Sequence, residues 1–306
     1  MTGGWRSVLE RAWAEERLGT LAVAVLVVMA ALAVGAPLLA GSPTALNALH
    51  RLEPPSLRHP FGTDDFGRDV LARTLYGGRV SLGLGLTVTV ATSVAGAALG
   101  LLSGFYPRMD GPLMRLMDGM MAFPPLVLAI ALVAALGPGL VSELIALWIV
   151  FTPRIARVVR ASTLQLRSSE MVEASRVSGS GPATILLGHV LPNAMAPLVV
   201  QASFVYAEVI LADAALSFLG LGVAPPVPTW GNMVADARDY MTVAPWFAIF
   251  PGLAIVVSVV SLNLAGDSLR AVLLPRSGAP RRRLGRGRQL HVSASSNSDR
   301  LMTVAE

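Results

Sequence analysis

The sequence predicts an all-α integral-membrane protein, and three observations support this fold class: its composition, its long uncharged segments and the distribution of its arginines. Of the 306 residues, 54% are hydrophobic and only 14% are charged, whereas soluble domains average about 25% charged residues. There is no cysteine, which excludes disulfides and thiolate metal sites. All 24 basic residues are arginine. The lysine that a P-loop places on nucleotide phosphates is therefore missing, and any ATP must be bound by another chain.

Six segments are long and apolar enough to cross about 30 Å of hydrocarbon. They are Leu18–Leu39, Val80–Gly104, Gly119–Leu140, Val141–Val159, Pro197–Leu219 and Thr242–Ala265. The fourth is the weakest, because arginines at its inner end must reach the headgroups. Only six of the arginines fall in segments 41–79 and 221–241. This asymmetry predicts an inner-membrane protein with both termini in the cytoplasm.

The remaining segments divide the chain further. Residues 1–17 have helical apolar spacing and predict an amphipathic helix in the inner interface, or alternatively a simple extension of the first span. Residues 40–79 form an extracytoplasmic loop with a short helix, and residues 80–275 carry the other five spans. The tail, 276–306, is rich in arginine, serine and glycine. We expect it to be disordered and to lie against anionic lipid.

The most informative cytoplasmic segment is 161–192, where two short helices are predicted at a sharp corner. Ser168 or Ser169 can cap the first helix. Gly179 supplies a left-handed residue that ends it. Pro192 is expected to break the second helix before the fifth span begins. A compact helical corner of this kind suits docking into a groove on another protein.

Here the sequence resembles a known family. Glu173-Ala174-Ser175, then Gly179, then His189-Val190-Leu191-Pro192 is similar to the EAA-x3-G-x9-I-x-L-P signature of ABC-importer permeases. Ser175 and His189 depart from that pattern, and a histidine at this point is found in the peptide and nickel branch. Four further segments resemble motifs of that branch in the same order: Phe61–Val70, Ala214–Gly222, Trp230–Met233 and Asn263–Arg270.

The resemblance implies a type I ABC-importer permease of the dipeptide, oligopeptide and nickel family, the second (C-type) permease of its pair. It implies two ABC ATPase subunits, a second homologous permease, an extracytoplasmic substrate-binding protein and membrane lipid as partners, without nucleic acid. ATP hydrolysis would reside in the partners, so the chain would be neither an enzyme nor a cofactor protein. The implied cargo is short peptides, with nickel chelates and glutathione as alternatives.

The family also implies roles for residues of the corner. It resembles the coupling helix that sits in a cleft of the ATPase, where Glu173 would accept a hydrogen bond from a basic residue and Gly179 would allow the close turn. The candidate coupling residues are Glu173, Ala174, Ser175, Gly179, His189, Leu191 and Pro192.

Two other groups of candidates lie outside the corner. On the outer face, Thr63 is predicted to cap a short helix that ends at Gly77. Residues there that would meet the binding protein are Asp64, Asp65, Arg68, Asp69, Trp230 and Asn232. For Arg68 and Asp69, a local salt-bridged cap is an equal alternative. A metal site at His50 and His59 is not expected.

Two acids, Glu208 and Asp213, fall well inside a predicted span. Because charge at mid-bilayer costs about 2.5–3.5 kcal/mol, they should face protein or water. Glu208 is the candidate for lining the translocation path and attracting a cationic group, and a hydrogen-bonded helix contact is its alternative. Asp213 is a second path candidate, with a structural role as the alternative.

Two other function classes stay open at this point. A self-energised secondary transporter or channel would need an inverted repeat, broken midplane helices or ion-binding acid pairs, and none is evident. A membrane-embedded enzyme would need catalytic residues at membrane depth. The sequence offers no HExxH motif and no cysteine for that chemistry.

Overall fold

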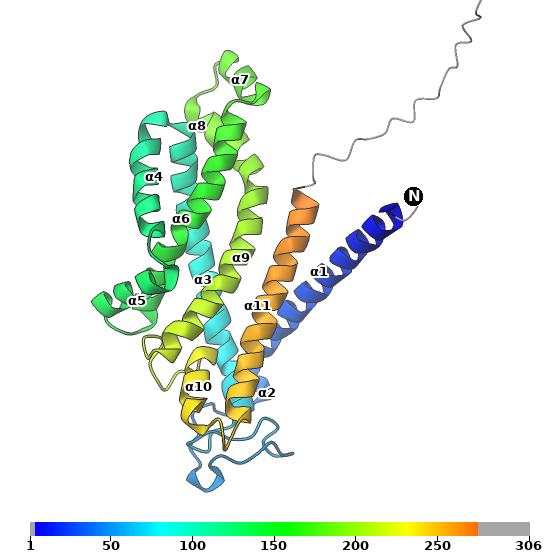
Figure 1. The fold of residues 1–306 in the computed structure, drawn as a ribbon, viewed down its shortest axis with the longest axis vertical. Coiled ribbons are helices and arrows are strands. Elements are labelled where there is room, and N and C mark those ends of the chain that lie inside the picture. Colours follow the sequence, from blue (N-terminus) through cyan, green and yellow to red (C-terminus); the bar gives the residue numbers. More distant parts are fainter. Residues whose placement is uncertain (1–3, 275–306) are drawn as a thin grey trace, which may run out of the picture. The chain divides into compact units, whose positions relative to one another are not determined.

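The computed structural model describes the backbone of residues 4–274 and the side chains of residues 17–274. This part is helical and contains no β-strand (Figure 1). The elements are α1 (Gly4–Val34), α2 (Ala36–Leu39), η1 (Ala48–His50), α3 (Val70–Phe105), α4 (Pro107–Met121), α5 (Pro125–Leu136), α6 (Leu140–Arg167), α7 (Glu170–Val177), α8 (Pro182–Ile185), η2 (Leu186–Val190), α9 (Leu191–Phe218), α10 (Trp230–Ala237), η3 (Arg238–Tyr240) and α11 (Trp246–Leu273).

The centre of the bundle is the contact between α3 and α6, which run in the same direction. Gly96 of α3 faces Ile155 of α6, and four residues further along both helices Gly100 faces Val159. A Cβ at Gly96 would lie 2.6 Å from the Cβ of Ile155. Small residues thus let the two backbones approach closely, as is typical of membrane helices. The main apolar core fills the space between α3, α5, α6 and α9.

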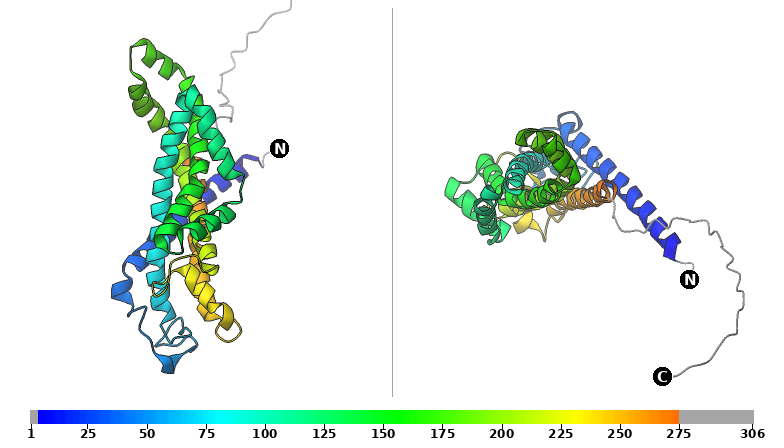
Figure 2. Two further views of the ribbon diagram at one scale, coloured as in Figure 1. Left: turned by 90° about the vertical axis from the view of Figure 1, so that its left-hand side faces the viewer. Right: turned by 90° about the horizontal axis from the view of Figure 1, so that it is seen from above.

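The long helices separate two ends of the described unit. The α7–α8 corner lies at one end, and α2, α10 and the blue loop that follows α2 lie at the other (Figures 1 and 2). Helix α11 lies beside α1 and α9. Any site at the α7–α8 corner is therefore a bundle length away from a site at α10.

By length and composition, four helical segments in the described part could each cross a membrane: Arg17–Val34, α3, the joined helix Pro182–Phe218 and α11. The pair α4 and α5 would add a fifth, but the two helices are bent by 92°. Helix α6 does not qualify by composition, because it carries Glu143 and several arginines. The all-helical fold class is confirmed, whereas the number of six spans stays a prediction.

The predicted span Gly119–Leu140 is not one continuous helix. Helix α4 ends at Met121 and α5 starts at Pro125, with a sharp bend between them. The cause is the Pro124-Pro125 pair. Proline disfavours helical backbone in the residue before it, so Phe123 and Pro124 both leave the helix.

Two expectations about helix ends are also wrong. The helix on the outer side begins at Val70 with Asp69 as its cap, not at Thr63, and it continues through Gly77 to Phe105. Gly77 serves close packing, because a Cβ there would lie 3.4 Å from the indole of Trp230.

Pro192 does not break its helix either. Helices α8, η2 and α9 run on as one 37-residue segment. The π-helical turn η2 lies just before Pro192, and a wider turn of this kind accommodates the missing proline N–H.

The predictions for the two termini remain untested. Helix α1 is continuous from Gly4 to Val34, so residues before the first span belong to the same helix as the span. The side chains of residues 1–16 and the whole tail 276–306 lie outside the described residues.

Candidate functional site

The corner after α6 has the predicted turn chemistry. Gly179 has φ +81°, and the N–H of Ser180 donates to the carbonyl of Ser175 at 3.0 Å. The N–H of Gly179 donates to the carbonyl of Arg176, also at 3.0 Å. These two bonds around a left-handed glycine form the Schellman motif that ends a helix. The predicted role of Gly179 in the turn is therefore confirmed by the geometry.

The predicted serine cap works differently. Ser169 is the cap residue of α7, but its side chain makes no capping bond to the helix. The Ser169 hydroxyl instead donates a 2.6 Å hydrogen bond to the carbonyl of Leu166 in the last turn of α6. The serine thereby ties α7 to the end of α6.

The corner is anchored by apolar side chains and exposes its polar ones. Val172, Ile185 and Val190 are buried in the main core, which fixes the corner against the bundle. The candidate residues divide accordingly: Glu173, Ala174, Gly179 and Pro192 are exposed, and Ser175, His189 and Leu191 are half-buried. The apolar side chain of Val177 is 83% exposed. An exposed acid beside exposed apolar groups is a surface suited to a protein partner.

Glu173 has one partner within the chain. Its carboxylate accepts a 3.4 Å hydrogen bond from Arg176, and both side chains are well exposed. Exposed ion pairs of this type stabilise by less than about 1 kcal/mol. The carboxylate of Glu173 can therefore exchange this partner for a basic group on another protein.

The outer-face candidates form a buried ion network. Asp64 is fully buried and accepts from Nε of Arg68 at 2.6 Å and from Nη1 of Arg73 at 2.5 Å. Arg73 also reaches Asp236 of α10, 3.3 Å away. Thr63, also buried, donates to the carbonyl of His50 at 2.5 Å. These side chains order the loop against α3 and α10, as the local-cap alternative stated.

Asp65 and Asp69 differ from Asp64. Asp69 caps α3 by accepting from the N–H of Ala72 at 2.8 Å, and it also contacts His59 at 2.8 Å. Asp65 is largely buried, and its Oδ1 has no hydrogen-bond partner, with Arg68 3.6 Å away. Burial, with the neighbouring charge of Asp64, raises the pKa of Asp65.

Trp230 and Asn232 are buried as well. The Trp230 indole N–H donates to the carbonyl of Thr74 at 2.9 Å, which joins α10 to α3. Asn232 closes a capping box with Thr229. Both residues thus position α10, and their side chains present little surface to a docking protein.

Among the path candidates, Glu208 is paired. It forms an ion pair with Arg154 of α6, and both side chains are about one-third exposed. This is the hydrogen-bonded helix contact that stood as the alternative. Ion pairing lowers the cost of placing either charge in a membrane. Sequence reasoning missed the partner because the two residues are 54 positions apart.

Helix α6 carries two further pairs on successive turns. Arg157 donates to Asp118 at 2.5 Å, and Arg160 donates two hydrogen bonds to Asp110, of 2.5 and 2.6 Å. Both acids belong to α4. The arginines of α6 thus bind acids of α4 and α9. The same charges make α6 too polar to count as a membrane span by composition.

Asp213 is 1% exposed and reaches no surface of the described chain. Its carboxyl faces Glu143 of α6, which is fully buried. Sequence reasoning missed Glu143, because the residue was placed at the end of a span. The sequence did contain a sign of its burial: Glu143 lies in the first turn of a helix, on a face that is otherwise apolar.

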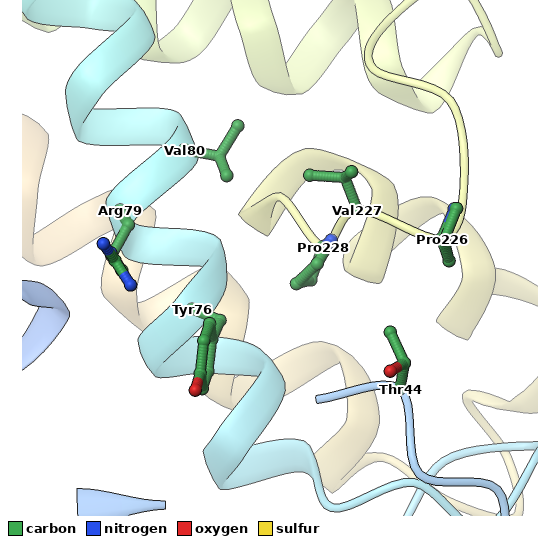
Figure 3. Close-up of a pocket in the computed structure, with 7 residues that line it drawn as sticks. All are labelled: Thr44, Tyr76, Arg79, Val80, Pro226, Val227 and Pro228. Carbon is green, nitrogen blue, oxygen red and sulfur yellow. The ribbon is translucent and has the colours of Figure 1, made fainter. Parts of the chain in front are cut away.

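A pocket lies at the α10 end of the bundle, between α3 and the loop before α10 (Figure 3). It has a volume of about 490 Å³ and is lined by Tyr76 and Arg79 of α3, by Pro226 to Pro228 and by Thr44. Arg79 is exposed and forms no ion pair with the described residues.

Comparisons with known proteins agree with this architecture. Residues 96–278 match the family "Binding-protein-dependent transport system inner membrane component". A putative peptide transport system permease protein of Brucella suis is 51% identical over 236 residues, which is 77% of this chain and 80% of that protein. A dipeptide transport system permease protein of Alkalihalophilus pseudofirmus is 41% identical over 89% of this chain and 90% of its own.

A solved structure shares the fold. It is the MetNI methionine ABC transporter in an inward-facing conformation, with a TM-score of 0.56, 20% identity, and coverage of 65% of this chain and 95% of that one. The family resemblance inferred from the motifs is thereby confirmed: the chain belongs to the binding-protein-dependent transport system inner membrane components.

Proposed function

We propose that this chain is the permease subunit of an ATP-driven importer of short peptides in the inner membrane. The observation that carries the proposal is the α7–α8 corner, a rigid helical projection anchored by buried Val172 and ended by the Gly179 turn. It stands at the opposite end of the bundle from α10 (Figure 1). The corner would dock into an ATPase subunit, and Glu173 would accept a bond from a basic residue there.

The peptide cargo is supported by the relatives whose names specify peptides, dipeptides or, in Pectobacterium atrosepticum, glutathione. In this proposal two ATPase subunits, a second permease and an extracytoplasmic binding protein complete the importer. The chain itself breaks no covalent bond and carries no cofactor. Nickel chelates remain the less supported cargo.

Six membrane crossings would follow if α6 and the bent α4–α5 pair both count as spans. Helix α6 has 28 residues, about 42 Å at 1.5 Å per residue, which suffices. Three of its four arginines are paired, with Glu208, Asp118 and Asp110, and the fourth, Arg167, lies in its last turn. An even number of crossings places both termini on one side, and the arginine asymmetry makes that side the cytoplasm.

The test is co-purification of the tagged chain from its native membrane, followed by measurement of peptide uptake. A P-loop ATPase and a second permease should accompany the wild type, and Gly179→Asp should weaken the ATPase or uncouple its hydrolysis. Gly41→Asp is the matched control, because Gly41 is an open glycine of the outer loop. A secondary transporter predicts no ATPase and no effect of Gly179→Asp, and that result would overturn the proposal.

A further inference from the structure

Two carboxyl groups meet in the interior of the bundle, away from the coupling corner. Glu143, in the first turn of α6, has 0% of its surface exposed, and Asp213 of α9 has 1%. They face one another, and Asp213 is the ionisable neighbour of Glu143. Neither carboxyl oxygen of Glu143 has a standard hydrogen bond to the described residues. A fully buried acid whose oxygens accept no standard hydrogen bond is rare in native structures and needs an explanation.

The charged groups of the surrounding helices are engaged elsewhere. On α3, Arg73 is bound to Asp64, and Arg79 is exposed at the outer pocket. On α9, Glu208 is paired with Arg154. Asp236 of α10 faces Arg73. No described cation therefore neutralises the Glu143–Asp213 pair, and two like charges this close cannot both stay ionised in an apolar interior.

The two acids differ in their surroundings. Asp213 accepts hydrogen bonds from hydroxyl groups. Ser217 Oγ lies 3.4 Å from its Oδ1, and Ser81 of α3 is also a hydrogen-bonding neighbour. The Ser81 oxygen already accepts from the backbone N–H of Trp230 at 3.2 Å. Its own proton is therefore free to point at Asp213. Glu143 receives no such donor. Hydrogen bonds to a carboxylate favour its ionised form, so Asp213 is the acceptor and Glu143 the acid.

A metal ion fits this site poorly. Hard cations need about six oxygen ligands, and no group of three or more metal-ligating side chains occurs in the described part of the chain. A proton needs only one donor and one acceptor. We propose that Glu143 holds a proton in the folded protein and donates it in a hydrogen bond to Asp213, forming a proton-binding site that joins α3, α6 and α9.

The site has a structural consequence. Ser81, Glu143 and Asp213 come from three different helices, and the Trp230 N–H adds α10. One shared proton thus links four helices near the α10 end of the bundle, and it leaves one negative charge at the site instead of two. Any motion that separates α6 from α9 must break this bond and leave both carboxyl groups to be solvated.

The test uses the full-length chain with its co-purifying subunits in lipid nanodiscs at neutral pH. Infrared spectra should show the C=O band of a protonated carboxyl group in the wild type. Glu143→Gln should remove this band, and Asp213→Asn should shift it, because the acceptor has changed. Asp239→Asn is the control, because that carboxyl is exposed and should leave the band unchanged. A band that survives Glu143→Gln would overturn the proposal.

Transport supplies a second, independent measurement. The Gln side chain keeps a neutral donor toward Asp213, so Glu143→Gln should assemble and transport like the wild type. Glu143→Leu removes the donor at similar size and should lower the amount of folded protein. If Glu143→Gln instead assembled normally but lost uptake, Glu143 would act as an anion, and the proton site would be refuted.

Discussion

Arg73 Nη1 and Asp64 Oδ2 lie 2.5 Å apart, with the two side chains 4% and 0% exposed. Asp64 also pairs with Arg68, so one carboxylate binds two buried guanidinium groups, and Asp65 and Asp236 supply further negative charge nearby. This network closes the outer loop onto the start of α3. It places Asp64, Arg68 and Arg73 inside the protein rather than on a docking surface.

The first prediction concerns this network. Asp64→Ala leaves Arg68 and Arg73 buried without their shared anion, and removing one partner of a buried pair costs about 3–5 kcal/mol. We expect a large fall in the thermal unfolding midpoint of the solubilised protein. Asp239→Asn, at an exposed pair with Arg238, should change the midpoint little. Equal midpoints for Asp64→Ala and wild type would contradict the assignment.

The second prediction concerns the Gly179 turn. Left-handed backbone costs a residue with a Cβ about 1–2 kcal/mol, and a Cβ at Gly179 would meet no other atom. Gly179→Ala should therefore loosen the corner by strain alone and weaken ATPase binding in a pull-down assay, and Gly179→Asn should do so less. Gly181→Ala is the matched control, because Gly181 is equally open but has φ −68°.

The third prediction concerns the contact between α3 and α6. A Cβ at Gly100 would lie 2.6 Å from the carbonyl oxygen of Ala156, and overpacking of this kind costs about 1–3 kcal/mol. Gly100→Ala should lower the thermal midpoint. Gly83→Ala, on the same helix but with no atom within 4 Å, should be neutral or stabilising by up to about 1 kcal/mol. Similar destabilisation by both variants would argue against the packing shown here.

The fourth prediction concerns Arg154 and Glu208. Glu208→Gln leaves Arg154 without its anionic partner. In the six-span proposal this is an unpaired charge in the membrane, at a cost of about 2.5–3.5 kcal/mol on insertion scales. We expect less inserted protein and reduced uptake. The exchange Arg154→Glu with Glu208→Arg should recover insertion. Arg157→Gln should cost less, because the Arg157–Asp118 pair is more exposed. Failure of the exchange to recover any protein would show that the pair does more than neutralise charge.

The fifth prediction concerns pH. Because burial raises the pKa of Asp65, its protonated form is favoured in the folded state. The contribution to stability is present below the unfolded pKa and is lost as pH rises through the folded pKa. Asp65→Asn, which stays neutral, should therefore unfold at a higher temperature than wild type at neutral pH. At acidic pH the two midpoints should converge. A constant difference across pH would contradict the shift.

The local features were predictable because their causes lie within a few residues. Hydropathy predicted membrane helices, and the helical class is confirmed. The turn at Gly179 followed from one glycine after a helical segment. The bend between α4 and α5 also has a local cause, the Pro124-Pro125 pair. It was missed because the apolar residues around the pair favoured a single membrane span. Helix α3 is capped by Asp69 rather than by Thr63. Buried ion pairs such as Asp64–Arg73 hold the residues after Thr63 in a loop, whatever their helix propensity.

The sequence by itself determined the membrane class, the family and the glycine turn of the α7–α8 corner, since these depend on composition and on short motifs. Only the tertiary structure decided which charges are partners: Arg154 with Glu208, Asp64 with Arg73, and Glu143 facing Asp213. The physical reason is range. A helix or turn is set by neighbours in sequence, whereas a buried charge is stabilised by whichever residue the folded bundle brings within a few ångströms.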